Sequence, residues 1–248
     1  MSRRLGSARM LTAEERTREV LNMHAYVSLW SADLLDVGRA VDLIADDADG
    51  LHVDVFDGHN VDELLFGPDF VAALRRRTAL LIDVHLNVTD PDHWARRFID
   101  VGADMVTVQA GPAADIRATL DKIRAAGAQP SLGVETHEPL IDAAALAEHV
   151  DRFLLMGTAI GVKGVGLDPR TPERIVQLRT RVRRSGHEKP IFVDGGIRPD
   201  TVAMLASAGA DGVIPGSLVF GAADPVAAIR HVHSLTFTDA SVTDPSSR

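Results

Sequence analysis

The sequence predicts a single (β/α)8 barrel that fills most of its 248 residues. Eight short apolar segments alternate with segments whose apolar residues recur at helical spacing, and the alternation spans about 210 residues, the size of such a barrel. The alternative is a doubly wound open sheet, which usually has fewer strands. Its G-x-G-x-x-G turn after the first strand is missing here, so the barrel is preferred.

The eight predicted strands are the apolar runs at residues 25–30, 50–56, 79–86, 104–110, 130–135, 152–158, 190–196 and 212–217. Helical patterns lie between them, such as "AADIRATLDKIRAAG" (113–127) and "TPERIVQLRTRVRRSG" (171–186). Each of these two patterns closes on a glycine that is suited to a helix C-cap. The long, glycine-rich connection at 159–170 is typical of a lid.

The barrel is predicted to occupy residues 24–235. Residues 1–23 form a polar extension with one short helical stretch, "TAEERTREVLNM", and residues 236–248 read as a disordered tail. Neither flank is expected to carry chemistry.

Composition limits the partners. A net charge of −9 argues against nucleic acid or an anionic membrane as the main partner. Cysteine is absent, which excludes a disulfide framework and a thiolate nucleophile. No apolar run approaches the roughly 20 residues that span a bilayer, and the basic start lacks the apolar core of a secretory signal. A cytoplasmic protein is therefore expected.

Charged residues in "LHVDVFDG" (51–58) point to a metal site. His52 and Asp54 share one face of the second strand, because side chains two apart on a strand point the same way. The third strand ends with His85 and the seventh with Asp194, at the same end of the barrel. One buried histidine or aspartate is usually structural, but two imidazoles and two carboxylates at one mouth make a ligand set for Zn2+ or a similar divalent ion.

A phosphate site is predicted beside these residues. "DGG" (194–196) and "PGS" (215–217) each follow a strand and precede a helix, where backbone amides can approach an anion closely. Ser217 would add a hydroxyl donor. Each tripeptide alone could be a tight turn, and the signal comes from their pairing at strands seven and eight.

Five segments resemble motifs of the ribulose-phosphate 3-epimerase family, in order and spacing, from about Val27 to Leu235. They are "SLWSADLL", "LHVDVFDGH", "IDVHL", "FVDGGI" and "PGSLVFGA". The resemblance implies an isomerase that inverts C3 of a ketose phosphate, with D-ribulose 5-phosphate and D-xylulose 5-phosphate as the expected pair. It also implies a small-molecule sugar phosphate as partner and a homo-oligomer, a dimer or a hexamer.

The resemblance assigns roles to single residues. His52, Asp54, His85 and Asp194 would bind one divalent metal ion, zinc first, with iron, manganese or cobalt as alternatives. Asp54 and Asp194 would also be the acid and base. Substrate contacts would come from the residues Ser28, His85, Met156, Gly161, Lys163, Gly164, Gly195, Gly196, Gly216 and Ser217.

Departures from the family pattern surround this set. Phe56 and Asn87 stand where methionines are usual, and Gln109 and Glu135 replace a common histidine and asparagine. The lid reads "IGVKGV" (160–165), which places Lys163 in a phosphate-facing stretch. Lysine is scarce in this chain, so Lys163 is either an anion contact or a solvated loop charge.

Three alternatives remain open. The enzyme could act on another ketose phosphate, such as allulose 6-phosphate. It could be a lyase on the same barrel, although the second strand lacks the D-x-K-x-x-D motif of related lyases. It could also be a non-catalytic sugar-phosphate binder, against which the two intact aspartates argue.

Overall fold

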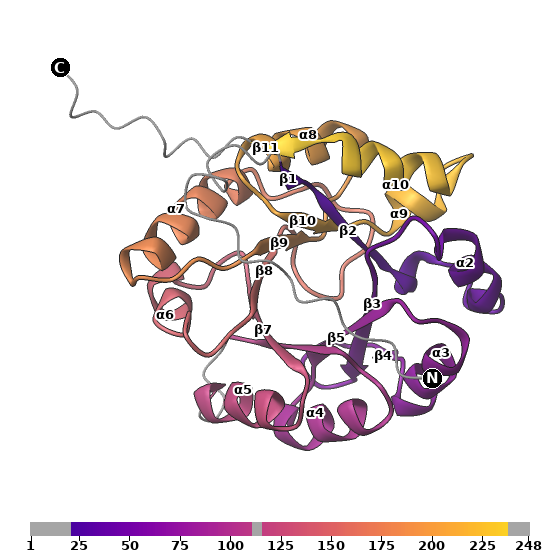
Figure 1. Ribbon diagram of the computed structural model, residues 1–248, viewed down its shortest axis with the longest axis horizontal. Helices are drawn as coiled ribbons and strands as arrows, with labels where there is room; N and C mark the ends of the chain where they lie inside the picture. The colour runs from indigo at the N-terminus through magenta and orange to yellow at the C-terminus, as the bar shows by residue number, and fades with distance from the viewer. Residues whose placement is uncertain (1–20, 111–115, 238–248) are drawn as a thin grey trace, which may run out of the picture.

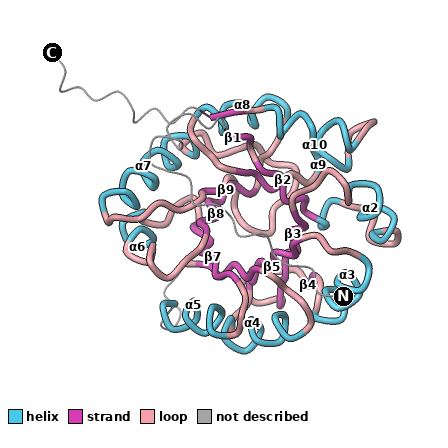
Figure 2. Tube along the Cα trace, in the orientation of Figure 1, coloured by secondary structure: helices cyan, strands magenta, loops and turns pink. Residues whose placement is uncertain are grey.

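A computed structural model describes residues 21–110 and 116–237. Within these ranges eight parallel strands form a closed barrel with helices on its outside, as the sequence predicts (Figures 1 and 2). Closure comes from the pairing of the first strand with both the second and the last. Around the barrel the strands are β2 (His24–Ser28), β3 (Gly50–Asp57), β5 (Leu81–Asn87), β6 (Met105–Gln109), β7 (Gln129–Val134), β8 (Arg152–Met156), β9 (Ile191–Asp194) and β10 (Gly212–Ile214).

The outer helices are amphipathic and bury their apolar faces against the strands. In α7, for example, Ile175, Leu178 and Val182 are buried at helical spacing. Several helices have a proline in the first turn. Its missing N–H costs nothing there, because the N–H groups of a first turn have no hydrogen-bond partner within the helix. The described helices are α2 (Val37–Ile44), α3 (Pro68–Arg77), α4 (Pro91–Asp100), α5 (Ile116–Ala125), α6 (Leu140–Ala144), α7 (Thr171–Arg184), α8 (Pro199–Ser207), α9 (Ser217–Phe220) and α10 (Pro225–Ser234), with a short 3-10 turn, η1 (Leu29–Ser31).

Most strands end earlier than the apolar pattern predicts. β9 stops at Asp194 because Gly195 and Gly196 adopt positive φ angles of 89° and 71°, which turn the chain out of the sheet. β10 stops at Ile214, before Pro215, which has no N–H for a strand ladder. The polar ends of the predicted strands therefore become loops at the barrel mouth.

Three short strands lie outside the barrel wall. β4 (Leu64–Leu65) pairs antiparallel with the end of β3. β1 (Leu21–Asn22) pairs antiparallel with β11 (Thr236–Phe237), so the last residues of the expected extension meet the first residues of the expected tail. Residues 1–20 and 238–248, including most of the predicted helix at 12–23, lie outside the described residues.

The barrel wall is buried on both faces, as parallel strands require. In β3 every residue from Gly50 to Phe56 is buried. The interior nevertheless contains charged side chains, which are costly there unless they are paired. Among the described residues, none of the helices has the length and apolar character needed to cross a bilayer.

Candidate metal centre

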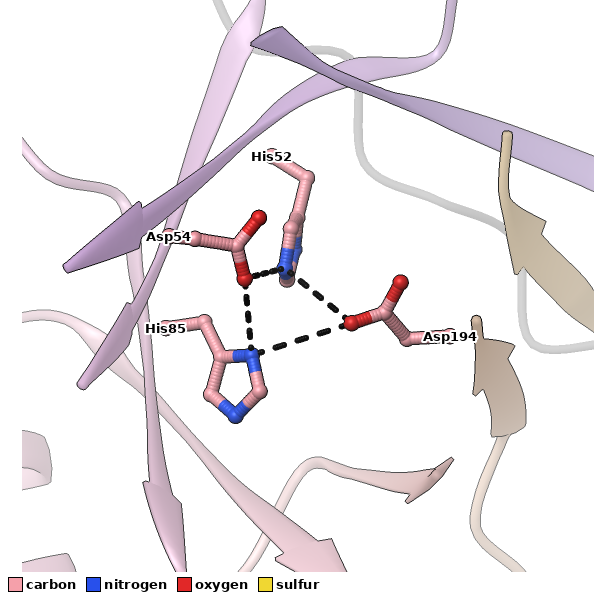
Figure 3. A group of neighbouring side chains, drawn as sticks. All are labelled: His52, Asp54, His85 and Asp194. Carbon is pink, nitrogen blue, oxygen red and sulfur yellow. Dashed lines mark hydrogen bonds and ion pairs between the residues drawn. The ribbon is translucent and has the colours of Figure 1, made fainter. Parts of the chain in front are cut away.

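Four side chains from three strands meet inside the barrel near its carboxyl end. β3 supplies His52 and Asp54, and the strand register places Asp54 beside His85 of β5. Asp194 is the last residue of β9. The predicted ligand set therefore comes together, and each of the four residues offers one ligand atom within 4.8 Å of the others (Figure 3).

The two carboxylates face the two imidazoles. Asp54 Oδ1 lies 3.2 Å from His52 Nε2 and 3.3 Å from His85 Nδ1. Asp194 Oδ2 approaches the same two nitrogens from the other side, at 3.8 and 3.9 Å (Figure 3). Ser28 Oγ donates to the second oxygen of Asp54 over 3.3 Å.

Each histidine has a second partner behind it. His52 Nδ1 lies 2.8 Å from Asp83 Oδ2. His85 Nε2 contacts the side-chain amide of Gln109, whose Oε1 has no hydrogen bond; turning the amide would let Oε1 accept a hydrogen bond from His85 Nε2–H. Gly133 leaves the room for this amide, since a Cβ there would lie 2.5 Å from Gln109 Nε2.

The surroundings push the pKa values of the two carboxylates apart. Burial alone would raise the pKa of Asp54, but the charges of both histidines and the hydrogen bond with His52 hold it well below its ordinary value. Burial and the charge of Asp54 raise the pKa of Asp194 to about 6, against the opposite effect of both histidines. Burial lowers the pKa of His52, yet the charges of Asp54 and Asp83 raise it well above 6.5. A positive charge is thus favoured at the centre of the cluster.

A divalent cation fits this set. Two imidazole nitrogens and two carboxylate oxygens suit zinc and several other transition metals. His85 Nδ1 is fully buried and makes no hydrogen bond, as expected for an atom that binds a metal. Asp54, Asp83 and Asp194 carry three negative charges, and the buried Arg152 balances one of them. A divalent ion would balance the other two with both histidines neutral.

A cavity of about 200 Å3 opens above the cluster. Asp54 and Asp194 form part of its floor, whereas His52 and His85 lie beneath it and are fully buried. His85 therefore does not line the cavity, although it was expected to contact substrate. The other predicted substrate contacts all line it: Ser28, Met156, Gly161, Lys163, Gly164, Gly195, Gly196, Gly216 and Ser217.

The glycines at one side of the cavity are required by the packing. A Cβ on Gly196 would lie 2.7 Å from the Cα of Leu167, and one on Gly195 would overlap Thr158. A Cβ on Gly161, in the predicted lid, would overlap Val61, which follows β3. The backbone at these turns thus packs closely and remains open toward the cavity.

Lys163 is not a fully solvated loop charge. Its Nζ donates to the Trp30 carbonyl oxygen over 2.7 Å and lies 4.1 Å from the centroid of the Trp30 ring. Burial lowers the pKa of Lys163, although the charges of Asp54 and Glu63 oppose that shift. Trp30 also packs edge-to-face on Phe56, with ring centroids 5.1 Å apart.

Sequence reasoning missed part of this site. Trp30, Thr158 and Ile160 line the cavity but were not singled out. Asp83 and Arg152 were not singled out either, although a charged residue within a predicted buried strand is a usable signal. Asp83 also stands two residues before His85, on the same strand face.

Comparison with known proteins gives a family match over most of the chain. A profile of the Ribulose-phosphate 3 epimerase family matches residues 24–220. The ribulose-phosphate 3-epimerase of Mycobacterium leprae is 34% identical over 202 residues, covering 82% of this chain and 90% of that protein. The protein of the same name from Mycobacterium tuberculosis (strain H37Rv) is 36% identical over 182 residues, covering 73% of this chain and 80% of that protein.

Solved structures agree on the fold. A 3-hexulose-6-phosphate synthase from Salmonella typhimurium aligns with a TM-score of 0.64 at 23% identity, covering 86% of this chain and 98% of that one. An orotidine 5'-phosphate decarboxylase from Pyrococcus horikoshii aligns with a TM-score of 0.62 at 19% identity, covering 84% and 97%. At these identities the likeness concerns the barrel alone.

Proposed function

The chain belongs to the ribulose-phosphate 3-epimerase family of isomerases, and from that premise we propose that it inverts C3 of a ketose phosphate, interconverting D-ribulose 5-phosphate and D-xylulose 5-phosphate. The reaction removes the proton on C3, next to the ketone, and returns a proton to the opposite face of that carbon. It therefore requires a base and an acid on the two sides of the substrate.

The observation that carries the proposal is the pair of aspartates on the cavity floor. Asp54 comes from β3 and Asp194 from β9, and both line the cavity while approaching the histidines from different sides (Figure 3). Their surroundings hold the pKa of Asp54 well below its ordinary value and raise that of Asp194 to about 6, so Asp194 takes up a proton more readily than Asp54. One carboxylate is thus placed to take the C3 proton and the other to supply one, and the roles exchange when the reaction runs backwards.

We propose that the four clustered residues His52, Asp54, His85 and Asp194 hold one divalent ion, with zinc as the first expectation. A bound ion would act as a Lewis acid that lowers the energy of negative charge on the substrate's carbonyl oxygen. Asp54 and Asp194 would each keep an oxygen available to the substrate, and Ser28 would orient the second oxygen of Asp54.

The glycine turns that line the cavity are proposed to bind the phosphate group. Gly195, Gly196 and Gly216 bring backbone close to the cavity without a Cβ, and Ser217 adds a hydroxyl. Lys163 has two ammonium donors left after its bond to the Trp30 carbonyl. It would add a positive charge near an anionic substrate in a chain whose net charge is −9.

One observation favours a different ketose phosphate as a second candidate. Trp30, Phe56 and Lys163 form one contiguous wall of the cavity, and Phe56 and Lys163 are departures from the family pattern. This wall leaves the two aspartates unchanged and would alter only which sugar fits. As the family resemblance implies, we also expect a homo-oligomer, and from the composition a cytoplasmic location.

The deciding experiment is proton NMR of D-ribulose 5-phosphate with the enzyme in D2O, with and without a chelator. We expect deuterium at C3 and D-xylulose 5-phosphate to appear together, and both to be lost on chelation. No exchange at C3 of this sugar, together with exchange at C3 of another such as allulose 6-phosphate, would transfer the assignment to the second candidate. No exchange with any ketose phosphate would contradict the epimerase proposal.

A further inference from the structure

A layer of buried polar side chains lies directly beneath the four clustered residues. Its members come from four different strands: Asp83 from β5, Thr107 from β6, Ser131 from β7 and Arg152 from β8. Each is at most 2% exposed. Charged side chains are rare at such depth unless they are paired, so their arrangement calls for a specific explanation.

Asp83 is held from three directions. Its Oδ2 is 2.8 Å from His52 Nδ1 and accepts a hydrogen bond from Arg152 Nη2 over 2.6 Å. Its Oδ1 accepts from Thr107 Oγ1 over 3.0 Å. A carboxylate in this position accepts a hydrogen bond from His52 Nδ1–H. The lone pair of Nε2, on the side of Asp54 and Asp194, is then available to bind the proposed metal ion.

Arg152 is in turn fixed by the barrel. Its Nε donates to Ser131 Oγ over 3.1 Å and its Nη2 to Thr107 Oγ1 over 2.9 Å. The guanidinium carbon lies 5.4 Å from the ring centroid of Tyr26 and 5.0 Å from that of Phe192, so two aromatic rings contact the cation. The side chain thus has little freedom to move away from Asp83.

We propose that Asp83 and Arg152 are positioning residues for the metal ligand His52: Arg152 fixes Asp83, and Asp83 fixes the tautomer and ring orientation of His52. The inference rests on the proposed metal centre. A carboxylate behind a metal-bound histidine typically changes metal affinity by 10–100-fold when it is lost. The competing explanation is an ion pair that only stabilises the barrel, and a change in metal binding separates the two.

The experiment uses the full-length chain and measures Zn2+ affinity by competition with a coloured chelator, together with the visible absorption spectrum of the Co2+ form. In Asp83→Ala and Arg152→Met we expect the Zn2+ dissociation constant to rise by about 10-fold or more. The Co2+ bands should shift, because the orientation of a ligand has changed. Asp83→Asn keeps an acceptor for His52 Nδ1 and should recover part of the affinity.

Arg179→Met is the matched control. Arg179 forms another ion pair in the protein, partly buried, with Asp211, and this pair belongs to neither the cluster nor the cavity. This variant should lose thermal stability and keep the wild-type metal affinity and Co2+ spectrum. If folded Asp83→Ala and Arg152→Met variants bind both ions like the wild type, the positioning role is wrong. If the wild type itself binds neither ion, the metal centre of the proposed function fails as well.

Discussion

At the scale of single residues, Asp54 and Asp194 differ in their surroundings more than in their chemistry. Asp54 accepts a hydrogen bond from Ser28, and its Oδ1 lies within 3.3 Å of a nitrogen of each histidine. The nearest contacts of Asp194 Oδ2 with these nitrogens are longer, at 3.8 and 3.9 Å, and the charge of Asp54 raises the pKa of Asp194. The pKa of the same side chain is therefore low at one position and raised at the other, which suits the two carboxylates to different parts in proton transfer.

Asp194→Asn tests this division directly. The amide cannot exchange a proton at C3, so we expect kcat to fall by 100-fold or more, in line with the usual contribution of a general acid or base of about 10²–10⁴. The measurement is steady-state turnover at saturating Zn2+, with the bound metal determined on the same sample. A variant that retains metal and near-wild-type kcat would remove Asp194 from the acid–base pair. Ser217→Ala is the control and should raise KM while leaving kcat nearly unchanged.

Lys163→Met tests the anion contact. Loss of one hydrogen bond to a charged group costs about 1.5–3 kcal/mol, so we expect KM for the phosphorylated sugar to rise roughly 10–100-fold with little change in kcat. Lys163→Arg should keep most of the affinity because it keeps the charge. Lys189→Met removes a lysine outside the residues that line the cavity and should behave like the wild type. An unchanged KM in Lys163→Met would mean that this lysine serves only the contact with Trp30.

At the scale of elements, the turn after β9 depends on a glycine pair. Gly196 has a φ of 71°, and a Cβ there would meet the Leu167 backbone at 2.7–2.8 Å. Gly196→Ala should therefore lower the free energy of unfolding by more than 1 kcal/mol and also raise KM, because the lid residue Leu167 must move. Gly186→Ala measures the cost of the positive φ angle without a steric clash, since Gly186 has a φ of 82° and nothing lies within 4 Å of its added Cβ. Equal losses in both variants, measured by urea unfolding, would contradict the packing argument.

At the amino end of the barrel, the carboxylate of Asp49 links the first strand to the last helix through two histidines. Asp49 precedes β3 and accepts from the Ala25 N–H at 2.8 Å, while His24 and His233 lie 3.2 and 2.9 Å from its oxygens. Burial would raise the pKa of Asp49, but these hydrogen bonds lower it below 3.8. The hydrogen bond to Asp49 raises the pKa of His24 above 6.5, against burial.

These two shifts define a pH window. The lowered pKa of Asp49 gives stability that is present above pH 3.8 and is lost as the pH falls through the folded value. The raised pKa of His24 gives stability that is present below pH 6.5 and is lost as the pH rises through its folded value. Because His24 is largely exposed, the effect should be about 1 kcal/mol or less.

Asp49→Asn should therefore lower the melting temperature most between about pH 4 and 6.5, and less at pH 9. The measurement is thermal unfolding of both proteins across this range. Asp47→Asn is the control from the same loop, because Asp47 pairs with Arg230, which does not titrate there. A difference between Asp49→Asn and wild type that does not vary with pH would show that the imidazoles contribute nothing.

The sequence predicts elements better than it predicts their ends. Alternation of apolar runs with helical patterns identifies all eight barrel strands. That the side chains of His52, Asp54, His85 and Asp194 point into the barrel at one end follows from strand geometry in a barrel. The two-residue strands at Leu21 and Leu64 have no such pattern and exist through pairing with distant segments. The wall made by Trp30 and Lys163 could not be predicted either, since 133 residues separate the two and only closure of the barrel brings them together.

At the scale of the whole molecule, the barrel concentrates three buried or nearly buried carboxylates around one axis. Asp54 and Asp194 belong to the cluster and Asp83 lies below it. Arg152 is paired with Asp83 and balances one of the three negative charges. Uncompensated charge of this kind lowers the stability of the folded state. The molecule should therefore be least stable when no cation is bound.

Metal removal tests this balance. An ion that binds only the folded chain, at 100 times its dissociation constant, stabilises it by about 2.7 kcal/mol. In a protein of this size that corresponds to a melting temperature higher by roughly 5–10 °C. We expect chelation to lower the melting temperature by this amount and Zn2+ to restore it. In Asp54→Asn/Asp194→Asn the restored shift should shrink to a degree or two, because half of the ligands and the charge that attracts the cation are gone. A full shift in the double variant would place the stabilising ion outside the barrel mouth and would contradict the metal centre as described.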